Sequence, residues 1–374
     1  MAFLGLSRQV KKTFRDYGSS LINSNYQEAR RRIKEAAKNQ AKELSLSRLG
    51  LSRLPPELYD LTNLQSLDLD NNKLRQLPPK LTRLSRLQSL DLGGNQFSRL
   101  PPEIGQFSNL QYLYLNRNPL RNLPAEIGRL RRLEWLNLDS NQLITLPPEI
   151  SRLANLERLL LGSNQLQKLP SEVGRLSNLR TLRLGHNQLT ELPSELGKLT
   201  KLQRLSLTNN QLRQFLPEIG QLKELLSLAL DINYLPIVPP EIAHLSKLHT
   251  LHLGDNYLQD LPSQIGQLSS LQTLGLSGNP LQELPSEIGH LTALKKLYVS
   301  RTLIQELPVE IAYLTQLERF DLTDNDYLEG IPDQVFDWPP AEMTRYILAQ
   351  QQEFDSAKPK AETQVQWRAL AAAA

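Results

Sequence analysis

The stretch that decides the fold runs from Leu133 to Leu153 and reads LEWLNLDSNQLITLPPEISRL, and its pattern returns every 23 residues. Most copies have a leucine pair such as Leu136 and Leu138, an asparagine three residues after the second leucine, and a segment similar to LPPEI. The pattern starts at Leu44 and its last copy starts at Phe320, twelve steps of 23 residues later with no slip. The sequence therefore predicts thirteen copies of one small structural unit.

The residue types predict how one unit folds. A repeat of this length cannot bury its apolar side chains alone, so neighbouring repeats must stack and share one core. Alternation along an extended strand sends Leu136 and Leu138 inward and Asn137 outward. Pro147 ends the strand because it has no N–H to donate. We therefore predict an α/β solenoid: a horseshoe with a parallel, concave β-sheet, short helical or 3-10 segments on the convex side, and helical caps at both ends.

The asparagine of each repeat lies where the strand should bend. A buried amide has donors and an acceptor, and can satisfy backbone groups that the bend leaves unpaired. Leu49 and Thr302 occupy this position in the first and twelfth repeats, and we expect the twelfth to be the weakest. We expect glycines such as Gly105 and Gly174 to adopt the turn conformation that returns the chain to the next strand. The predicted structural ladder comprises Asn72, Asn95, Asn118, Asn141, Asn164, Asn187, Asn210, Asn233, Asn256, Asn279 and Asn325.

The pattern LxxLxxLxLxxNxLxxLPxxIGxL resembles the 23-residue class of intracellular leucine-rich-repeat proteins, over residues 41–332. That class includes Ras-group proteins and the repeat halves of bacterial and cyanobacterial Roco proteins. The resemblance implies a protein-interaction scaffold whose partner is a small GTPase or another signalling protein. It does not extend to a GTPase domain, because the sequence contains no G-x-x-x-x-G-K-[ST] motif.

Residues 1–40 differ in charge from the repeats. Ten Lys or Arg and three Asp or Glu fall within residues 1–42, a balance of +7, whereas the whole chain carries +4. The remainder is thus weakly acidic, which argues against a nucleic-acid partner. Within residues 1–20, apolar side chains recur every three or four positions among basic ones. This segment is either a basic amphipathic helix that contacts a membrane or directs the chain to an organelle, or an ordinary helix packed on the first repeat.

Both ends of the array need covers because bare strand edges pair with other chains. We predict that residues 1–40 form a basic leader and a capping helix. Asn25 would be the N-cap of this helix, and its inward stripe would contain Ala29, Ile33, Ala37 and Ala41. Residues 41–332 hold the thirteen repeats, residues 333–355 a C-terminal cap in which Phe336 and Trp338 plug the last coil, and residues 356–374 a flexible tail.

The outward side chains of the strands should line the inner curve, where a partner can reach them. Aromatic residues and arginine are enriched at binding hot spots, and they fall on adjacent predicted strands here. The alternative is that the aromatic side chains merely pack on one another across strands. The predicted partner-binding residues are Tyr112, Tyr114, Trp135, Asn137, Asp139, Arg158, Arg183 and Arg204.

The sequence offers little for catalysis. It has no cysteine, and we predict no catalytic residues, no cofactor and no metal site. His249 and His252 are the pair considered for a metal, with Asp231 or Asp255 nearby, but their spacing on a strand points the rings to opposite sides unless His249 precedes the strand. The absence of cysteine fits a reducing compartment. We therefore predict a cytoplasmic, monomeric, non-enzymatic protein-binding scaffold, with a membrane- or organelle-directed adaptor or effector as the alternative.

Overall fold

The computed structural model describes residues 24–326, 328, 334–335 and 338–357, and side chains are described up to residue 346 and at 348–349. The basic segment 1–20, Phe336 and residues 358–374 of the predicted tail lie outside the described residues, whereas residues 356–357 are helical and do not belong to a tail. Within the described residues, thirteen three-residue strands form one parallel sheet whose order follows the chain from β1 to β13. The predicted leucine-rich-repeat solenoid is thereby confirmed. The chain divides into two compact units, Met1–Leu212 with Gln221–Leu225, and Arg213–Gly220 with Leu226–Ala374.

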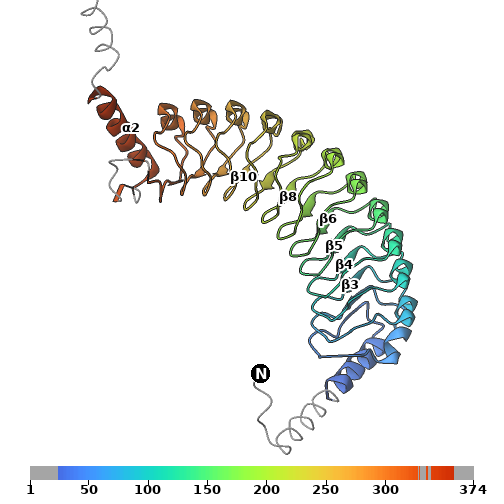
Figure 1. Ribbon diagram of the computed structural model, residues 1–374. Helices are drawn as coiled ribbons and strands as arrows, with labels where there is room; N and C mark the ends of the chain where they lie inside the picture. The colour runs from blue at the N-terminus through green and yellow to red at the C-terminus, as the bar shows by residue number, and fades with distance from the viewer. Residues whose placement is uncertain (1–23, 327, 329–333, 336–337, 358–374) are drawn as a thin grey trace, which may run out of the picture. The chain divides into compact units, whose positions relative to one another are not determined.

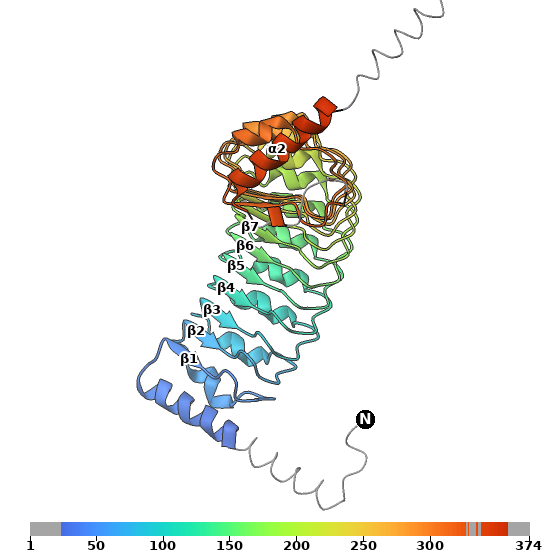
Figure 2. The ribbon, with the colours of Figure 1, turned by 90° about the vertical axis from the view of Figure 1, so that its left-hand side faces the viewer.

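In the first unit, strands and 3-10 turns alternate, and Figure 2 shows its strands side by side. One strand and the turn that follows it make up one coil of the solenoid. Strand register is direct, with Tyr112 opposite Trp135 and Trp135 opposite Arg158. The elements are β1 Glu43–Ser45, η1 Pro56–Asp60, β2 Ser66–Asp68, η2 Pro79–Arg83, β3 Ser89–Asp91, η3 Pro102–Gln106, β4 Tyr112–Tyr114, η4 Ala125–Arg129, β5 Trp135–Asn137, η5 Pro148–Arg152, β6 Arg158–Leu160, η6 Ser171–Arg175, β7 Thr181–Arg183, η7 Ser194–Lys198 and β8 Arg204–Ser206.

The second unit repeats this arrangement and adds a helix, α2, after its last strand. Figure 1 shows that each coil carries its strand on one side and its 3-10 turn on the other. The turn η8, Pro217–Gln221, falls at the boundary of the two units. The elements that follow are β9 Ser227–Ala229, η9 Pro240–His244, β10 Thr250–His252, η10 Ser263–Gln267, β11 Thr273–Gly275, η11 Ser286–His290, β12 Lys296–Tyr298, η12 Val309–Tyr313, β13 Arg319–Asp321 and α2 Pro340–Ala357.

Leucines fill the core of every coil. Leu136, Leu138 and Leu143 have no exposed surface, and neither does Ile150 of the turn η5. Proline opens this turn, and it ends where the Leu153 N–H donates to the carbonyl of Ile150. Each coil thus buries four or more large apolar side chains that it could not cover alone, which explains why the repeats fold only as a stack.

The ladder asparagines are buried and bonded to backbone. The Asn141 side-chain NH₂ donates to the carbonyls of Leu115 and Leu138 at 3.0 and 2.9 Å and lies 3.4 Å from that of Asp139. Its oxygen accepts the N–H of Leu120 at 3.2 Å. The amide therefore joins its own coil to the one before it.

The chain bends at the residue before the ladder asparagine, which adopts a left-handed conformation. Ser140 has φ 58° and Ile232 has φ 56°, and Gly94 and Gly278 occupy the same position in their coils. The expected turn role of Gly105 and Gly174 is wrong, since neither has a positive φ. Gly105 is needed for close packing instead, because a Cβ there would lie 2.6 Å from the carbonyl oxygen of Glu126 in the next coil.

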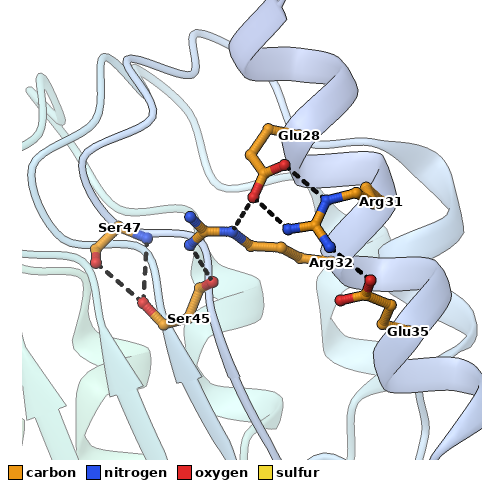
Figure 3. A network of polar contacts seen from close by, with 6 residues as sticks. All are labelled: Glu28, Arg31, Arg32, Glu35, Ser45 and Ser47. Carbon is orange, nitrogen blue, oxygen red and sulfur yellow. Dashed lines mark hydrogen bonds and ion pairs between the residues drawn. The ribbon is translucent and has the colours of Figure 1, made fainter.

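A helix at residues 24–38 covers the first coil. Figure 3 shows Arg32 reaching from this helix to the carbonyl of Ser45 in β1, at 3.2 Å, while Glu28 accepts from Arg31 and Arg32. These two guanidinium groups lower the pKa of Glu28 to about 2. Arg30 also pairs with Glu57 of η1. The contacts anchor the helix to both sides of the first coil.

Three local expectations are wrong. Residue 24 is already helical, so Asn25 lies inside the helix and is not its N-cap. Ala36 is buried in place of Ala37, because positions 29, 33 and 36 follow the helical period more closely. Trp338 is 38% exposed and packs edge-on against Tyr346 of α2, with ring centroids 5.4 Å apart, instead of filling the last coil.

Candidate functional site

The predicted partner-binding residues lie on the exposed face of the sheet in the first unit, and direct register sorts them into rows. One row runs Tyr112, Trp135, Arg158, Thr181 and Arg204, from the first position of β4 to β8. The parallel row from the third position of each strand holds Tyr114, Asn137, Leu160, Arg183 and Ser206. Asp139 lies two residues past Asn137, beyond the strand. The eight residues thus share one face, but Arg158 and Arg204 are separated by Thr181.

The centre of this face is an aromatic patch, which we define as Tyr112, Tyr114, Trp135 and Arg158. The Arg158 guanidinium lies over the Trp135 ring, 4.4 Å from its centroid. The rings of Tyr114 and Trp135 are 5.9 Å apart and tilted by 49°. Arg158 is exposed and the three aromatic side chains are half-buried. The expected packing of aromatics across strands therefore coexists with an exposed surface.

Tyr112 is oriented by an acidic neighbour. Its hydroxyl donates to Glu134 at 3.4 Å, and Gln111 donates to the other oxygen of the same carboxylate at 3.2 Å. The charge of Glu134 raises the pKa of Tyr112, so the phenol stays protonated and can donate a hydrogen bond. The ring of Tyr112 is thereby held at the edge of the aromatic patch.

One polar atom of the patch has no partner. The indole N–H of Trp135 is buried, and within the described residues nothing accepts its hydrogen bond. A buried donor without a partner costs on the order of 1–3 kcal/mol. An acceptor on a bound molecule that displaced the covering side chains would recover this free energy.

Leu160 lies next to the patch but contributes little surface. It occupies an outward position of β6, yet only 8% of it is exposed, and Thr181 at 9% is similar. Leu160 is flanked in register by Asn137 and Arg183. Strand alternation places Leu160 on the outward face, but its neighbours cover it. The exposed apolar surface of this face therefore comes from the aromatic rings and not from Leu160.

Charge changes sign across the patch. Asp68 and Asp91 lie in register on β2 and β3, and Asp70 follows β2. Burial and the neighbouring charges of Asp70 and Asp68 together raise the pKa of Asp91 to about 6, although the hydrogen bond from the Gly93 N–H lowers it. Toward the other end of the unit, the charge is positive: Arg158 of the patch on β6 is followed by exposed Arg183 on β7 and Arg204 on β8.

Asp139 marks the boundary between the two charged regions. Its carboxylate accepts the N–H of Gly162 at 2.6 Å. Burial raises the pKa of Asp139, while Gly162 and the charge of Arg183 lower it. Asp139 is therefore committed to its own backbone, and Arg183 is the more accessible charge of the pair.

The described residues contain no cluster of three or more His, Asp or Glu side chains that could hold a metal. His252 lies on β10, whereas His249 precedes that strand and its ring contacts the carbonyl of Lys247 at 2.6 Å. Within the same part of the chain, no helix has both the length and the apolar composition needed to cross a membrane.

Comparisons with known proteins agree with this architecture. A model described as leucine-rich repeat region matches residues 132–238 and 236–333, and one described as leucine rich repeat matches residues 39–97 and 85–143. A leucine-rich-repeat protein of Leptospira interrogans is 39% identical, with a TM-score of 0.63 over 77% of this chain and 86% of that one. A search of curated proteins finds no match.

Two further solved structures contain bound partners. The plant peptide hormone receptor RGFR1, in complex with RGF2, is 31% identical with a TM-score of 0.65, covering 75% of this chain and 47% of that one. Drosophila Toll, in complex with Spatzle, is 26% identical with a TM-score of 0.65, covering 73% and 40%. This chain thus spans less than half of either of those two chains.

Proposed function

Because this chain belongs to the leucine-rich-repeat proteins, which generally act as interaction scaffolds, we propose that it is a non-enzymatic scaffold that binds a partner protein. The binding surface is the exposed sheet face of the first unit, centred on the aromatic patch. The observation that carries the proposal is Arg158 stacked on Trp135, in direct register with Tyr112 on three adjacent strands. Tyr, Trp and Arg are the side chains that most often dominate the energy of protein interfaces.

The charges beside the aromatic patch define the partner further. Arg158, Arg183 and Arg204 favour acidic side chains on one part of the partner, and Asp68 and Asp91 favour basic ones on another. An apolar or aromatic anchor between these regions would contact Trp135. A small GTPase or another signalling protein is the partner class that the family resemblance suggests. A cytoplasmic location belongs to the same proposal, since the chain has no cysteine for disulfides.

The test is an affinity purification of the full chain from its native cells, with quantitative mass spectrometry. The variant is Tyr112→Ala/Trp135→Ala/Arg158→Ala. The control is Arg86→Ala/Arg132→Ala, which removes two exposed arginines in the turns that follow η2 and η4.

We expect the triple variant to reduce recovery of the principal partner at least tenfold while its circular dichroism spectrum matches the wild type. The control should recover the partner normally. Full recovery by a folded triple variant would reject the aromatic patch as the binding site.

A further inference from the structure

The second unit has a row of apolar side chains at a position where the first unit mainly has glutamine. It lies at the position directly after the ladder asparagine, where five earlier coils have Gln96, Gln142, Gln165, Gln188 and Gln211, and two have Lys73 and Pro119. In four consecutive coils of the second unit the same position holds Tyr234, Tyr257, Pro280 and Leu303. Tyr234 and Tyr257 are 46% and 56% exposed, whereas Pro280 and Leu303 are half-buried. Glutamine would satisfy the fold here, so the fold does not explain the apolar side chains.

The tyrosines begin a contiguous patch. Their rings are stacked, with centroids 5.9 Å apart and planes 20° apart, and the Arg213 guanidinium lies 6.0 Å from the Tyr234 ring. Ile232 and Ile237 of the same coil as Tyr234 are 46% and 64% exposed. Large exposed side chains gathered on neighbouring coils mark interaction surfaces, whereas isolated ones do not.

Ile232 adds a physical argument. Its φ of 56° is a left-handed conformation, which β-branched residues rarely adopt because the side chain clashes with the backbone. Asn71 and Asn209 occupy the equivalent position in other coils, and asparagine tolerates it better. The coil thus retains a strained, exposed isoleucine where a polar residue would fold more easily.

An acidic row runs beside the apolar one. Three residues after Tyr257, Pro280 and Leu303 stand Asp260, Glu283 and Glu306, all exposed. In the part of the chain that the structure describes, none of these three carboxylates pairs with a lysine or arginine. The equivalent position in the first unit holds Lys168 and Glu191, which pair at 2.8 Å. The second unit therefore presents unneutralised negative charge within about 10 Å of the apolar row, since three residues span no more than that.

The spacing of the rows indicates the shape of the occupant. Successive strands are about 4.8 Å apart, and the stacked tyrosine rings are 5.9 Å apart. One turn of an α-helix rises about 5.4 Å, which falls between these values. Alternate side chains of an extended strand are about 6.8 Å apart and lose register after two or three coils. A helix lying along the row can therefore place one apolar side chain per coil.

From the apolar row, the adjacent acidic row and their spacing, we infer that the second unit binds a basic amphipathic α-helix presented by a partner protein. Its apolar face contacts Tyr234, Tyr257, Pro280 and Leu303. Lysine or arginine on its flank faces Asp260, Glu283 and Glu306. This surface is separate from the aromatic patch, so its occupant is a second partner or a second segment of the same one.

The experiment measures fluorescence anisotropy of labelled 18-residue peptides with the full chain. The main probe carries leucine at i, i+4, i+7, i+11 and i+14 and lysine beside it. A second probe has glutamate in place of every lysine, a third is a scrambled version, and a fourth is a proline-rich basic peptide of equal charge.

Two variants test the two rows. Tyr234→Gln/Tyr257→Gln introduces the glutamine that other coils have at this position, and should lower the affinity for the lysine probe at least tenfold. Asp260→Lys/Glu283→Lys/Glu306→Lys should reverse the preference, so that the variant no longer binds the lysine probe and binds the glutamate probe instead. Gln142→Ala/Gln165→Ala in the first unit is the matched control and should bind like the wild type.

The Tyr112→Ala/Trp135→Ala/Arg158→Ala variant should also bind the lysine probe normally, which separates this inference from the proposed function. The inference is overturned if the wild type ignores the lysine probe or binds the scrambled probe equally well. Preference for the proline-rich peptide, or a charge reversal that leaves probe choice unchanged, would overturn it too.

Discussion

The asparagine ladder makes a quantitative prediction, because neighbouring amides share carbonyl groups. The carbonyl of Leu115 accepts from Asn118 of its own coil at 3.1 Å and from Asn141 of the next at 3.0 Å. The carbonyl of Leu138 is likewise shared by Asn141 and Asn164. Removing one amide thus leaves each of these carbonyls with a partner.

The magnitude follows from what Asn141→Ala leaves unpaired. The N–H of Leu120 loses the Asn141 oxygen, and both carbonyls keep one donor. One orphaned buried N–H costs about 1–3 kcal/mol, so we expect a loss of that size and not the sum of four hydrogen bonds. Asn118→Ala should behave in the same way. The double variant orphans the carbonyl of Leu115 as well, which should add about 1–3 kcal/mol beyond the sum of the single changes.

The matched control is Asn95→Ala/Asn141→Ala. Asn95 donates to the carbonyls of Leu69 and Leu92, and Asn141 contacts neither of them. The losses of unfolding free energy from the two single changes should therefore add within about 0.5 kcal/mol in the double variant. Urea unfolding followed by circular dichroism gives the free energies, and amide exchange of the Leu120 N–H gives a local check. Additivity in the Asn118/Asn141 pair would refute the shared-carbonyl argument.

Four further changes test other features. Leu138→Ala, at a fully buried position, should cost about 2–5 kcal/mol in urea unfolding, and a loss below 1 kcal/mol would contradict the packed core. Ile232→Asn should stabilise the fold by about 1 kcal/mol in urea unfolding, because asparagine tolerates a positive φ better than isoleucine does. Unchanged stability would show that the conformation of Ile232 is not strained. Thr302→Asn should slow amide exchange in its coil, and exchange already as slow there as around Asn141 would argue against a weak coil. The carboxylate of Asp91 has its pKa raised from 3.8 to about 6, so the folded chain binds a proton that the unfolded chain releases in that window, and stability falls as pH rises through it. Asp91→Asn keeps an oxygen for the Gly93 N–H and should flatten this dependence, removing about 1 kcal/mol of it once solvent screening is considered, as thermal melts at pH 5 and 7.5 will show.

The sequence predicted the fold because each coil repeats the same constraints. Leucine spacing places Leu136 and Leu138 inward, and proline ends the strand segment, so the strands and turns follow from local rules. The left-handed residue before each ladder asparagine was missed because that position holds Ser, Arg, His and Ile as well as Asn and Gly. The left-handed conformation at this position is imposed by the stacking of the coils and not by the preference of the residue.

The candidate site was only partly accessible from the sequence. Register alone places Tyr112, Trp135 and Arg158 side by side, since equal repeats stack without offset. The stacking of Arg158 on Trp135 and the unpartnered indole N–H depend on side-chain rotamers, which periodicity does not specify. The burial of Leu160 likewise depends on how its neighbours lie.

In this chain, the informative positions are those that the repeat leaves free. A ladder asparagine or core leucine reports only on folding, because every coil needs it. Trp135 on the sheet and Tyr234 after the ladder occupy positions where other coils use serine or threonine, and glutamine, respectively. Both retain a cost that folding does not demand, an orphaned N–H at Trp135 and a strained isoleucine two residues before Tyr234. Binding of a partner supplies a reason for both costs. The affinity purification tests this for Trp135, and the peptide-binding experiment tests it for the row that begins at Tyr234.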